Sequence, residues 1–380
     1  MEQICDKNKC TGCGACQNIC KRNAIKMDFN KEGFIIPIFD PSKCVDCQQC
    51  IRVCPVNHPR ELNEPITAYK GSSNNVEIKK QSSSGGIFSE LAKVVLSEGG
   101  SVFGAYLDDT LSVRHIMIED EQDLGKIRGS KYIGSDTSNV FRLIQAKLNE
   151  GETVLFSGTP CQVAGLKNYV NNSIGTLITT DFICHGVGSK TLFTMYIEHE
   201  EKKINSKVET FVFRSKIKNY TDFPCLFTFN NAKTKTYNFY KTSFGNAFST
   251  GKINRISCST CQYANKGRVS DITLADCIHN LNMTEKKLGC SFVIISTELG
   301  KSLIDKSDIS INPINIEEIS KVQSHLSKPQ SPHEYRSLIF QNIDEGYEYI
   351  VNKYMAPPKK SIIKSLKERF RYAKSKFYKS

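Results

Sequence analysis

The spacing of apolar residues predicts a chain that alternates between helices and strands. Apolar side chains at positions 87, 88, 91, 94 and 95 recur at helical spacing, so we expect a helix over 87–96. Short apolar runs predict buried strands over 101–107, 154–157 and 175–182. This succession is typical of an α/β domain. Upstream, residues 34–39 (FIIPIF) predict a strand whose proline favours the edge of a sheet.

Three polar turns border these elements. Residues 81–86 (QSSSGG) open the first helix, where free N–H groups attract an anion, with a flexible linker as the alternative. Residues 128–135 (RGSKYIGS) suit a phosphate and a flat ring, with an ordinary surface loop as the alternative. Thr159 is placed to cap a helix that starts at Pro160. We expect the helix dipole to lower the pKa of Cys161 in its first turn.

Length and composition describe a packed protein of several domains. At 380 residues the chain is long enough for two or three domains, and 39% hydrophobic residues suffice for packed cores. The sequence has no run of 18 apolar residues, which argues against a spanning helix. Its first residues lack the apolar centre of a secretory signal. We therefore expect a cytoplasmic protein.

Cysteine is the outlier, because nine of the 16 cysteines lie within the first 54 residues. Residues 10–20 and 44–54 both read Cys-x2-Cys-x2-Cys-x3-Cys, at an offset of 34. This spacing matches bacterial two-cluster ferredoxins, in which the fourth thiolate of each cluster comes from the other repeat. We therefore assign one [4Fe–4S] cluster to Cys10, Cys13, Cys16 and Cys54, and the other to Cys44, Cys47, Cys50 and Cys20.

Two alternatives for these thiols are weaker. A disulfide scaffold is disfavoured in a reducing compartment. Structural zinc needs only paired Cys-x2-Cys segments, whereas here the third and fourth cysteines also recur in register. Gly12 and Gly14 allow the backbone to approach the sulfur atoms. Two clusters in one module form a path for single electrons, so we expect another redox centre downstream; Cys5 is assigned no role.

Four further cysteines follow predicted elements in the body. Cys161 begins a helix, and Cys184 follows the strand over 175–182, at the end of a strand where ligands gather in open sheets. Cys258 and Cys261 form a Cys-x2-Cys pair. We interpret the four as ligands of a third [4Fe–4S] cluster, with zinc or a catalytic dithiol as alternatives. His185 is a candidate proton donor, with simple packing as the alternative.

These segments together resemble the beta subunits of coenzyme F420-reducing hydrogenase and of F420-linked formate dehydrogenase. Bacterial single-chain members with an N-terminal ferredoxin module are the most similar. The matching segments are Gln81–Ser89, Gly129–Ser135, Gly158–Lys167, Ile183–Ser189, Phe213–Lys216 and Cys258–Asp276. The family's acidic motif continues Asp-Phe-Trp-Gly, whereas Asp276 is followed here by Cys277-Ile-His279. That departure leaves the substrate pocket, and F420 as its ligand, open.

The resemblance implies FAD beside a [4Fe–4S] cluster, with two-electron chemistry on F420 or another organic substrate. The cofactor-binding residues would be Ser84, Gly85, Gly86, Ser130, Lys131, Tyr132, Ser135, Thr159, Pro160 and Gln162. Thr159, Pro160 and Gln162 would lie near the isoalloxazine. Lys131 and Arg128 would stabilise a phosphate or the reduced ring, unless they are solvated surface charges. Lys131 and His185 are the candidate catalytic residues.

The expected fold is multidomain, α+β followed by α/β. It has a ferredoxin-type domain over 1–64 and a flavin-binding body whose two parts span 65–150 and 151–310. A loop is expected at 71–75. Residues 311–380 are expected to form a helical tail with a basic end.

The net charge of +12 is concentrated in that tail, because residues 356–380 hold nine basic residues and one acid. Apolar residues within 359–380 follow one helical stripe. Such a helix is typical of contact with an acidic partner or, in a peripheral protein, with the inner membrane surface. The alternative is a tail that is merely solvated. Binding of nucleic acid by this helix is disfavoured.

The favoured hypothesis is an iron–sulfur flavoprotein oxidoreductase. A ferredoxin-like donor would pass electrons through the clusters to FAD, which would reduce or oxidise a small organic substrate. The bacterial relatives imply a role in cell-surface polysaccharide biosynthesis. The alternatives are an electron-transfer subunit that reduces a partner enzyme and, less favoured, a redox sensor that binds nucleic acid.

Overall fold

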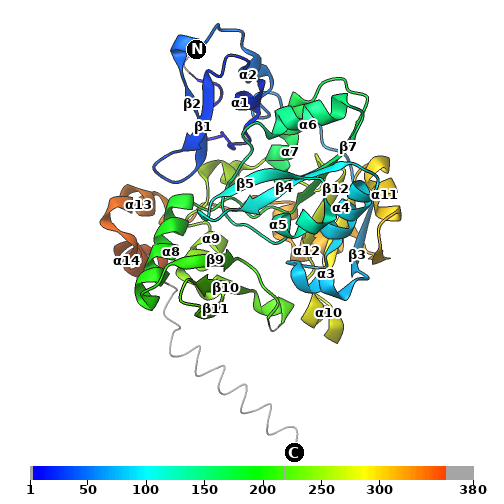
Figure 1. The fold of residues 1–380 in the computed structure, drawn as a ribbon. Helices are drawn as coiled ribbons and strands as arrows, with labels where there is room; N and C mark the ends of the chain where they lie inside the picture. The colour runs from blue at the N-terminus through cyan, green and yellow to red at the C-terminus, as the bar shows by residue number, and fades with distance from the viewer. Residues whose placement is uncertain (1–2, 218, 357–380) are drawn as a thin grey trace, which may run out of the picture.

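A computed structural model describes residues 3–217 and 219–356 of the chain (Figure 1). The basic amphipathic helix expected over 359–380 lies outside these residues. Within the described part, no helix combines the length and the apolar character needed to cross a membrane.

The N-terminal module is a small α+β unit. Its strands β1 (Ile25–Phe29) and β2 (Ile35–Phe39) pair antiparallel, with Met27 opposite Pro37. The predicted strand is confirmed, and its proline lies in a two-stranded sheet in which each strand is an edge. Helices α1 (Ala15–Ile19) and α2 (Gln49–Arg52) each follow a Cys-rich loop. They contact one another, so the two repeats lie side by side.

The body is built on a nine-stranded mixed sheet with the order β14-β3-β13-β12-β8-β7-β4-β5-β6. Strands β4, β7, β8 and β12 run parallel, and antiparallel strands extend the sheet on both sides. The strands are β3 (Thr67–Ser73), β4 (Ser101–Leu107), β5 (Val113–Ile118), β6 (Ser135–Asp136), β7 (Thr153–Ser157), β8 (Thr176–Phe182), β12 (Ile272–Asp276), β13 (Ser291–Ile295) and β14 (Ile309–Pro313). The strands predicted near 101, 154 and 175 are confirmed.

Helices cover both faces of this sheet, which explains why its central strands are apolar on both sides. On β4, Val102 packs toward α4 and α11, and the next residue, Phe103, packs toward α6 and α7. The larger helices are α4 (Ile87–Ser97), α6 (Val140–Asn149), α7 (Pro160–Tyr169), α8 (Lys190–Ile204) and α11 (Glu298–Asp305). The shorter ones are α3 (Val76–Gln81), α5 (Leu124–Ile127), α9 (Ser243–Ser249), α10 (Met283–Leu288), α12 (Ile316–Val322), α13 (Arg336–Gln341) and α14 (Tyr347–Ile350).

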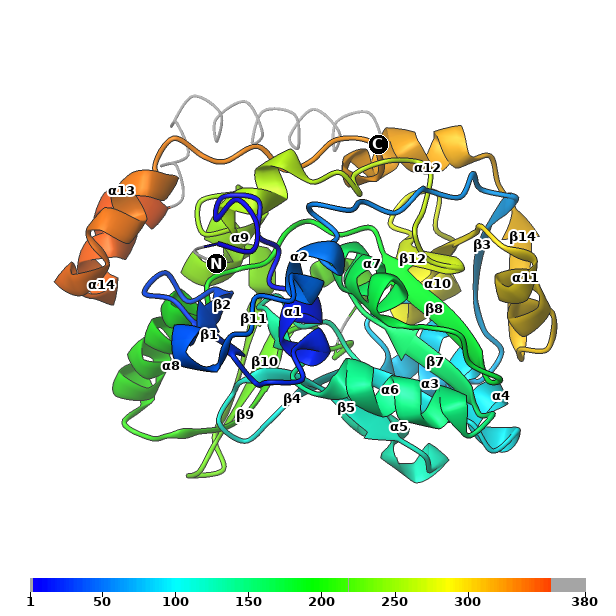
Figure 2. The same ribbon diagram turned by 90° about the horizontal axis from the view of Figure 1, so that it is seen from above.

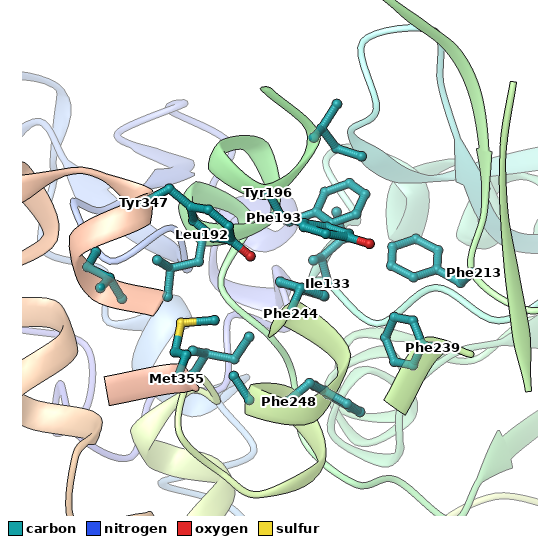
Figure 3. Packing of buried hydrophobic residues seen from close by; sticks show 14 of the residues in the cluster. Ile133, Leu192, Phe193, Tyr196, Phe213, Phe239, Phe244, Phe248, Tyr347 and Met355 are labelled. Atoms are coloured by element: carbon teal, nitrogen blue, oxygen red, sulfur yellow. The ribbon is translucent and has the colours of Figure 1, made fainter. Parts of the chain in front are cut away.

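A second, three-stranded antiparallel sheet lies beside the body. Its order is β11-β10-β9, with strands β9 (Val208–Val212), β10 (Pro224–Phe229) and β11 (Thr234–Asn238). Aromatic rings fill the space between this sheet and α8, α9, α13 and α14, as Figure 3 shows for part of the cluster. Phe193 stacks on Phe213 with ring centroids 5.0 Å apart. Figure 2 shows α8, α13 and α14, which contribute to this core, on the side of the molecule away from β14.

The N-terminal module docks on the α6–α7 face of the body (Figure 1). Arg142 of α6 donates to the carbonyl oxygens of Asn18 (2.7 Å) and Cys20 (2.8 Å). Thr137 donates its hydroxyl to the carbonyl of Cys13 at 2.8 Å. Asn168 of α7 donates to the carbonyl of His58 at 2.9 Å. The module is therefore held to the body by side chains that bind its backbone.

The structure corrects one sequence-based expectation about the fold. The loop expected at 71–75 is wrong over its first three residues, because Gly71–Ser73 continue β3 between β13 and β14; Asn74 and Asn75 form a loop as predicted. A Cβ atom on Gly71 would lie 2.3 Å from the carbonyl oxygen of Ser310, so close packing requires the glycine there.

Candidate functional site

The first group of thiols surrounds a small cavity in the N-terminal module. Cys10, Cys13 and Cys16 come from the loop before α1, and Cys54 follows α2. All four line this cavity. Burial raises the pKa of Cys16, and the charges of the other three thiols raise it further. The fold thus brings together the four residues that the sequence assigns to one cluster. Cys5, to which no role was assigned, also lines this cavity.

Left-handed backbone shapes both Cys-rich loops. Gly12 and Gly14 have φ of 70° and 82°, and a Cβ atom on Gly12 would lie 2.4 Å from the carbonyl oxygen of Ile35. At the equivalent positions of the second repeat, Asp46 and Gln48 also have positive φ, 52° and 58°. The two loops therefore have the same unusual backbone, which only the first repeat achieves with glycine.

The second group of thiols lies nearer the surface. Burial raises the pKa of Cys50, and the charges of Cys20 and Cys47 add to it. The backbone N–H of Asp46 donates to Cys44 Sγ, and that of Ala24 to Cys20 Sγ, both at 3.3 Å. Such N–H donors to sulfur tune a cluster's potential. Cys47 is exposed, so this end of the module is accessible to a redox partner.

The third group of thiols lies where the body meets the module. Cys161 is in the first turn of α7, Cys184 follows β8, and Cys258 is in the turn Ile256–Thr260, with Cys261 next to it. Burial raises the pKa of Cys184, and the charges of the other three raise it further. The predicted Thr159 cap at Pro160 is confirmed. The expected lowering of the Cys161 pKa is wrong, because burial outweighs the helix end and raises it.

The first and third groups are neighbours across α7. A Cβ atom on Gly165 of α7 would lie 2.9 Å from Cys13 Sγ, and the charge of Cys161 acts on the pKa of Cys13. Arg255 lies between the two groups: it donates to the carbonyl oxygens of Cys10 (3.1 Å) and Ile35 (2.7 Å). Arg255 is 6% exposed, and in the described residues no carboxylate pairs with it.

The donor chemistry of these groups fits iron–sulfur clusters. The thiols lie in groups of four, with buried donors beside them. Thr11 Oγ1, Arg255 Nε and Ser257 Oγ are buried without a hydrogen-bond partner in the described structure. Donors of this kind bond to the sulfur atoms of a bound cluster.

A larger cavity of about 310 Å³ opens from the third thiol group. It lies within the size range of small-molecule sites. Of the sequence-predicted cofactor and catalytic residues, the structure places these on its wall: Ser84, Gly86, Ser130, Lys131, Tyr132, Ser135, Thr159, Gln162 and His185. Cys161 also lines it. Gly85 and Pro160 do not line the cavity, because Gly85 donates its N–H to Ser291 Oγ and Pro160 is buried in α7.

One end of this cavity is rich in hydroxyl groups and cations. Ser130 donates its backbone N–H to Ser83 Oγ at 2.7 Å. Arg128 donates to Ser89 Oγ at 3.0 Å, and Lys131 Nζ donates to the carbonyl of Arg128 at 2.7 Å. Neither cation has a carboxylate within ion-pair distance among the described residues. Burial lowers the pKa of Lys131 to about 7. A bound anion would supply the missing counter-charge.

Sequence reasoning gave no role to several other residues on the cavity wall. His115 lies between Ser135 Oγ (2.7 Å) and the carbonyl of Ser157 (2.9 Å), and burial lowers its pKa to about 4, so the ring is neutral. Arg214 pairs with Asp276, and both belong to segments that carried the family resemblance. His115 gave no such signal, because it is an isolated histidine on β5.

The fold and these groups define a class: an electron-transfer protein with an iron–sulfur module docked on a mixed α/β body. Residues 9–58 match the family model of a 4Fe-4S dicluster domain. Residues 151–321 match the family model for the C terminus of the coenzyme F420 hydrogenase/dehydrogenase beta subunit. Over 151–321 the chain is therefore similar to that beta-subunit family, and over 9–58 it carries an iron–sulfur module.

Comparison with other proteins adds one structure. A chain of the F420-reducing [NiFe] hydrogenase complex from Methanosarcina barkeri matches with 17% sequence identity and a TM-score of 0.49. The match covers 78% of this chain and 97% of that one. No curated protein matches the sequence.

Exchange of the fourth ligand between the repeats can be tested with paired substitutions. Cys10→Ala combined with Cys54→Ala should remove about four iron atoms, because both thiols would hold one cubane. Cys10→Ala combined with Cys20→Ala should remove about eight. Iron and sulfide analysis of the anaerobically purified variants measures the loss of iron. Cys225→Ala is the control, because Cys225 is a buried thiol outside all three groups. If instead each repeat holds its own cluster, Cys10→Ala with Cys54→Ala should remove about eight iron atoms, and Cys10→Ala with Cys20→Ala about four.

Proposed function

We propose that the chain is a flavin-dependent iron–sulfur oxidoreductase with three [4Fe–4S] clusters and one FAD. Electrons from a ferredoxin-like donor enter at the exposed second thiol group. They pass through the first and third groups to the flavin, which reduces or oxidises a small organic substrate or an F420-like deazaflavin.

The observation that carries this proposal is the continuity of the large cavity. Cys161 lies on its wall, and so do Arg128 and Lys131, which have no carboxylate partner among the residues that the structure describes. A dinucleotide needs both features, since its ring must approach a redox partner and its phosphates require cations. Bound FAD would exchange single electrons with clusters and paired electrons with a substrate.

The chain's own residues suggest the division of labour. Ser83, Ser130 and Arg128 bind and orient the phosphates at the cationic end. Gln162 donates to the carbonyl of Ser135 at 3.1 Å and accepts from the backbone N–H of Thr159, so it is held rigidly beside the expected ring position. Because the pKa of Lys131 is lowered to about 7, its side chain can gain or release a proton near neutral pH beside the expected flavin. His185 also lies on the cavity wall, where burial and the neighbouring His325 lower its pKa to about 4, so the neutral ring can accept a proton rather than deliver one.

A second candidate function is an electron-transfer subunit that reduces a partner enzyme. It is favoured by the family itself, since the matched model describes one subunit of a hydrogenase or dehydrogenase. The basic segment 359–380 would then contact an acidic partner or, in a cytoplasmic protein, the inner membrane surface. A role in cell-surface polysaccharide biosynthesis belongs to the first proposal.

Cofactor analysis of the anaerobically purified chain tests the proposal. We expect about twelve iron atoms, from three four-iron cubanes, and one FAD per chain. Cys184→Ala should remove about four iron atoms and leave the N-terminal clusters. Eight iron atoms in the unmodified chain would refute the third cluster, and absence of flavin would favour the electron-transfer subunit.

The cationic end can be tested separately. Arg128→Met combined with Lys131→Met should weaken FAD binding at least tenfold, because two cations are lost at the phosphates. Lys126→Met is the matched control, since Lys126 is close in sequence but exposed and paired with Asp123 at 2.6 Å. Flavin fluorescence during titration of the flavin-free protein measures both. Equal affinities would show that the phosphates bind elsewhere.

A further inference from the structure

Two cysteines outside the three thiol groups lie opposite one another at the end of a strand pair. Strands β12 and β13 are antiparallel with Asp276 opposite Ser291, so the next pair outward is Cys277 and Cys290. The backbone N–H of Cys277 donates to the carbonyl of Cys290 at 3.1 Å, which continues the register. Directly opposed residues have Cα atoms about 4.5–5.5 Å apart. A disulfide spans about 4.4–6.8 Å, so no backbone shift is needed to join them.

The two thiols are buried and contact each other. Cys277 is 0% exposed and Cys290 is 1% exposed. The Cys277 thiol donates to the carbonyl of His279 at 3.5 Å, and the Cys290 thiol donates to that of Gly71 at 3.4 Å. The interaction between the two thiols lowers the pKa of Cys277 and raises that of Cys290, and the Lys70 ammonium also lowers the pKa of Cys277. The pair therefore has one thiol that favours the thiolate and a second thiol in contact with it, which is the arrangement that disulfide exchange uses.

The surface segment that connects β12 to β13 lies beside the pair and is held by Lys70. The connection between β12 and β13 includes α10, and Met283 there is 80% exposed. Lys70 holds this segment from β3: its Nζ donates to the carbonyl of Asn280 at 2.8 Å and pairs with Glu285 at 3.0 Å. Leu281 of this connection packs against the cluster that holds both cysteines, together with Ile319 and Leu326 from the region of α12. Local opening on this side would expose the thiols while the sheet stays intact.

The pair also contacts the wall of the large cavity. The carbonyl of Cys290 accepts hydrogen bonds from Ser84 Oγ at 2.5 Å and from the hydroxyl of Tyr220 at 3.3 Å. Asp276, the residue before Cys277, pairs with Arg214. Ser84, Asp276 and Arg214 all line the cavity. A covalent change at the pair therefore acts on groups that would contact a ligand.

We propose that Cys277 and Cys290 are a redox-active pair that closes to a disulfide by exchange with a low-molecular-weight disulfide. The Cys277 thiolate attacks one sulfur of that disulfide, which releases one small thiolate and forms a mixed disulfide. The Cys290 thiol loses its proton and attacks Cys277 Sγ, which releases the second small thiol. Two protein thiols are oxidised and one small disulfide is reduced to two thiols. The pair exists whether or not flavin or a third cluster is bound.

The test uses the full-length protein with its clusters, under anaerobic conditions. The protein is equilibrated with mixtures of reduced and oxidised glutathione, quenched with N-ethylmaleimide in denaturant, reduced, and labelled with iodoacetamide. Peptide mass spectrometry then reports each cysteine. We expect Cys277 and Cys290 to change label together and reversibly, with unchanged iron content. Cys225, also 0% exposed but surrounded by aromatic rings, is the control that stays reduced.

A second variant tests access without changing the charges around the pair. Asn282→Ala removes the side-chain oxygen that caps α10 by accepting from the backbone N–H of Glu285, so the segment should open more readily and the pair should be oxidised severalfold faster at the same glutathione ratio. If both cysteines stay reduced in the natural chain and in Asn282→Ala, the proposal is wrong. It is equally wrong if they carry glutathione singly and never form the peptide cross-link.

Discussion

Arg268→Met is expected to lower the free energy of unfolding by about 3–5 kcal/mol, because it leaves Asp181 buried without its counter-charge. Arg268 is 1% exposed and pairs with Asp181 at 3.0 Å. It also donates to the carbonyl oxygens of Tyr263 (3.0 Å) and Asn265 (3.1 Å). The residue therefore joins β8 to the segment that follows Cys261, and its loss should also disturb the third thiol group.

Chemical denaturation of the anaerobic protein measures this effect. Lys266→Met is the control, since Lys266 lies on the same segment but pairs with Glu317 at the surface, where the change should be below about 1 kcal/mol. Adding Asp181→Leu to Arg268→Met should recover part of the loss, because no charge is then left unpaired. A loss of stability no larger than that of Lys266→Met would show that the pair contributes little.

Arg255→Gln is expected to make the potentials of the first and third clusters more negative. A buried unit charge about 8 Å away contributes roughly 2 kcal/mol at an effective dielectric constant of about 20. That energy corresponds to roughly 90 mV for one electron. The direction follows because a cation stabilises the more negative, reduced form of a cluster. The expectation for the third cluster depends on the proposed function.

Arg336 provides a closely matched control. Arg255 and Arg336 are 6% and 7% exposed, and their guanidinium groups lie 5.2 and 5.8 Å from the centroid of the Phe34 ring. Arg336 pairs with Glu32 at 2.7 Å, so its charge is already neutralised. Redox titration followed by electron paramagnetic resonance should show shifts in Arg255→Gln, near-normal values in Arg255→Lys, and none in Arg336→Gln. Unchanged potentials with full iron content would contradict the assigned role.

Local chemistry explains why much of the fold could be predicted. The helix at Ile87 and the strand over Ser101–Leu107 have strong periodicity, and both are confirmed. The repeated Cys spacing led to the match with a dicluster domain. The strand at Gly71 could not be predicted, because a glycine-serine run reads as a loop. It becomes a strand only through pairing with β13 and β14, which are distant in the sequence.

The site shows the same division between local and long-range information. Cys161 was found from its helix start, but the rise in its pKa depends on burial by distant segments. No sequence motif marks Arg255 as a functional residue. Its position becomes informative only in the folded chain, where the first and third thiol groups lie on either side of it. Cys277 was noticed only as a departure from the family's motif. Its contact with Cys290 depends on the pairing of β12 with β13.

The way Arg142, Thr137 and Asn168 bind the backbone of the N-terminal module has a consequence for the speed of electron delivery. A carrier on a swinging tether must diffuse to its acceptor, so its rate depends on solvent viscosity and on linker length. Here the donor and acceptor thiols share α7 as a common wall. Under the proposed function, electrons would pass between them over a fixed separation, so this step should not depend on solvent viscosity.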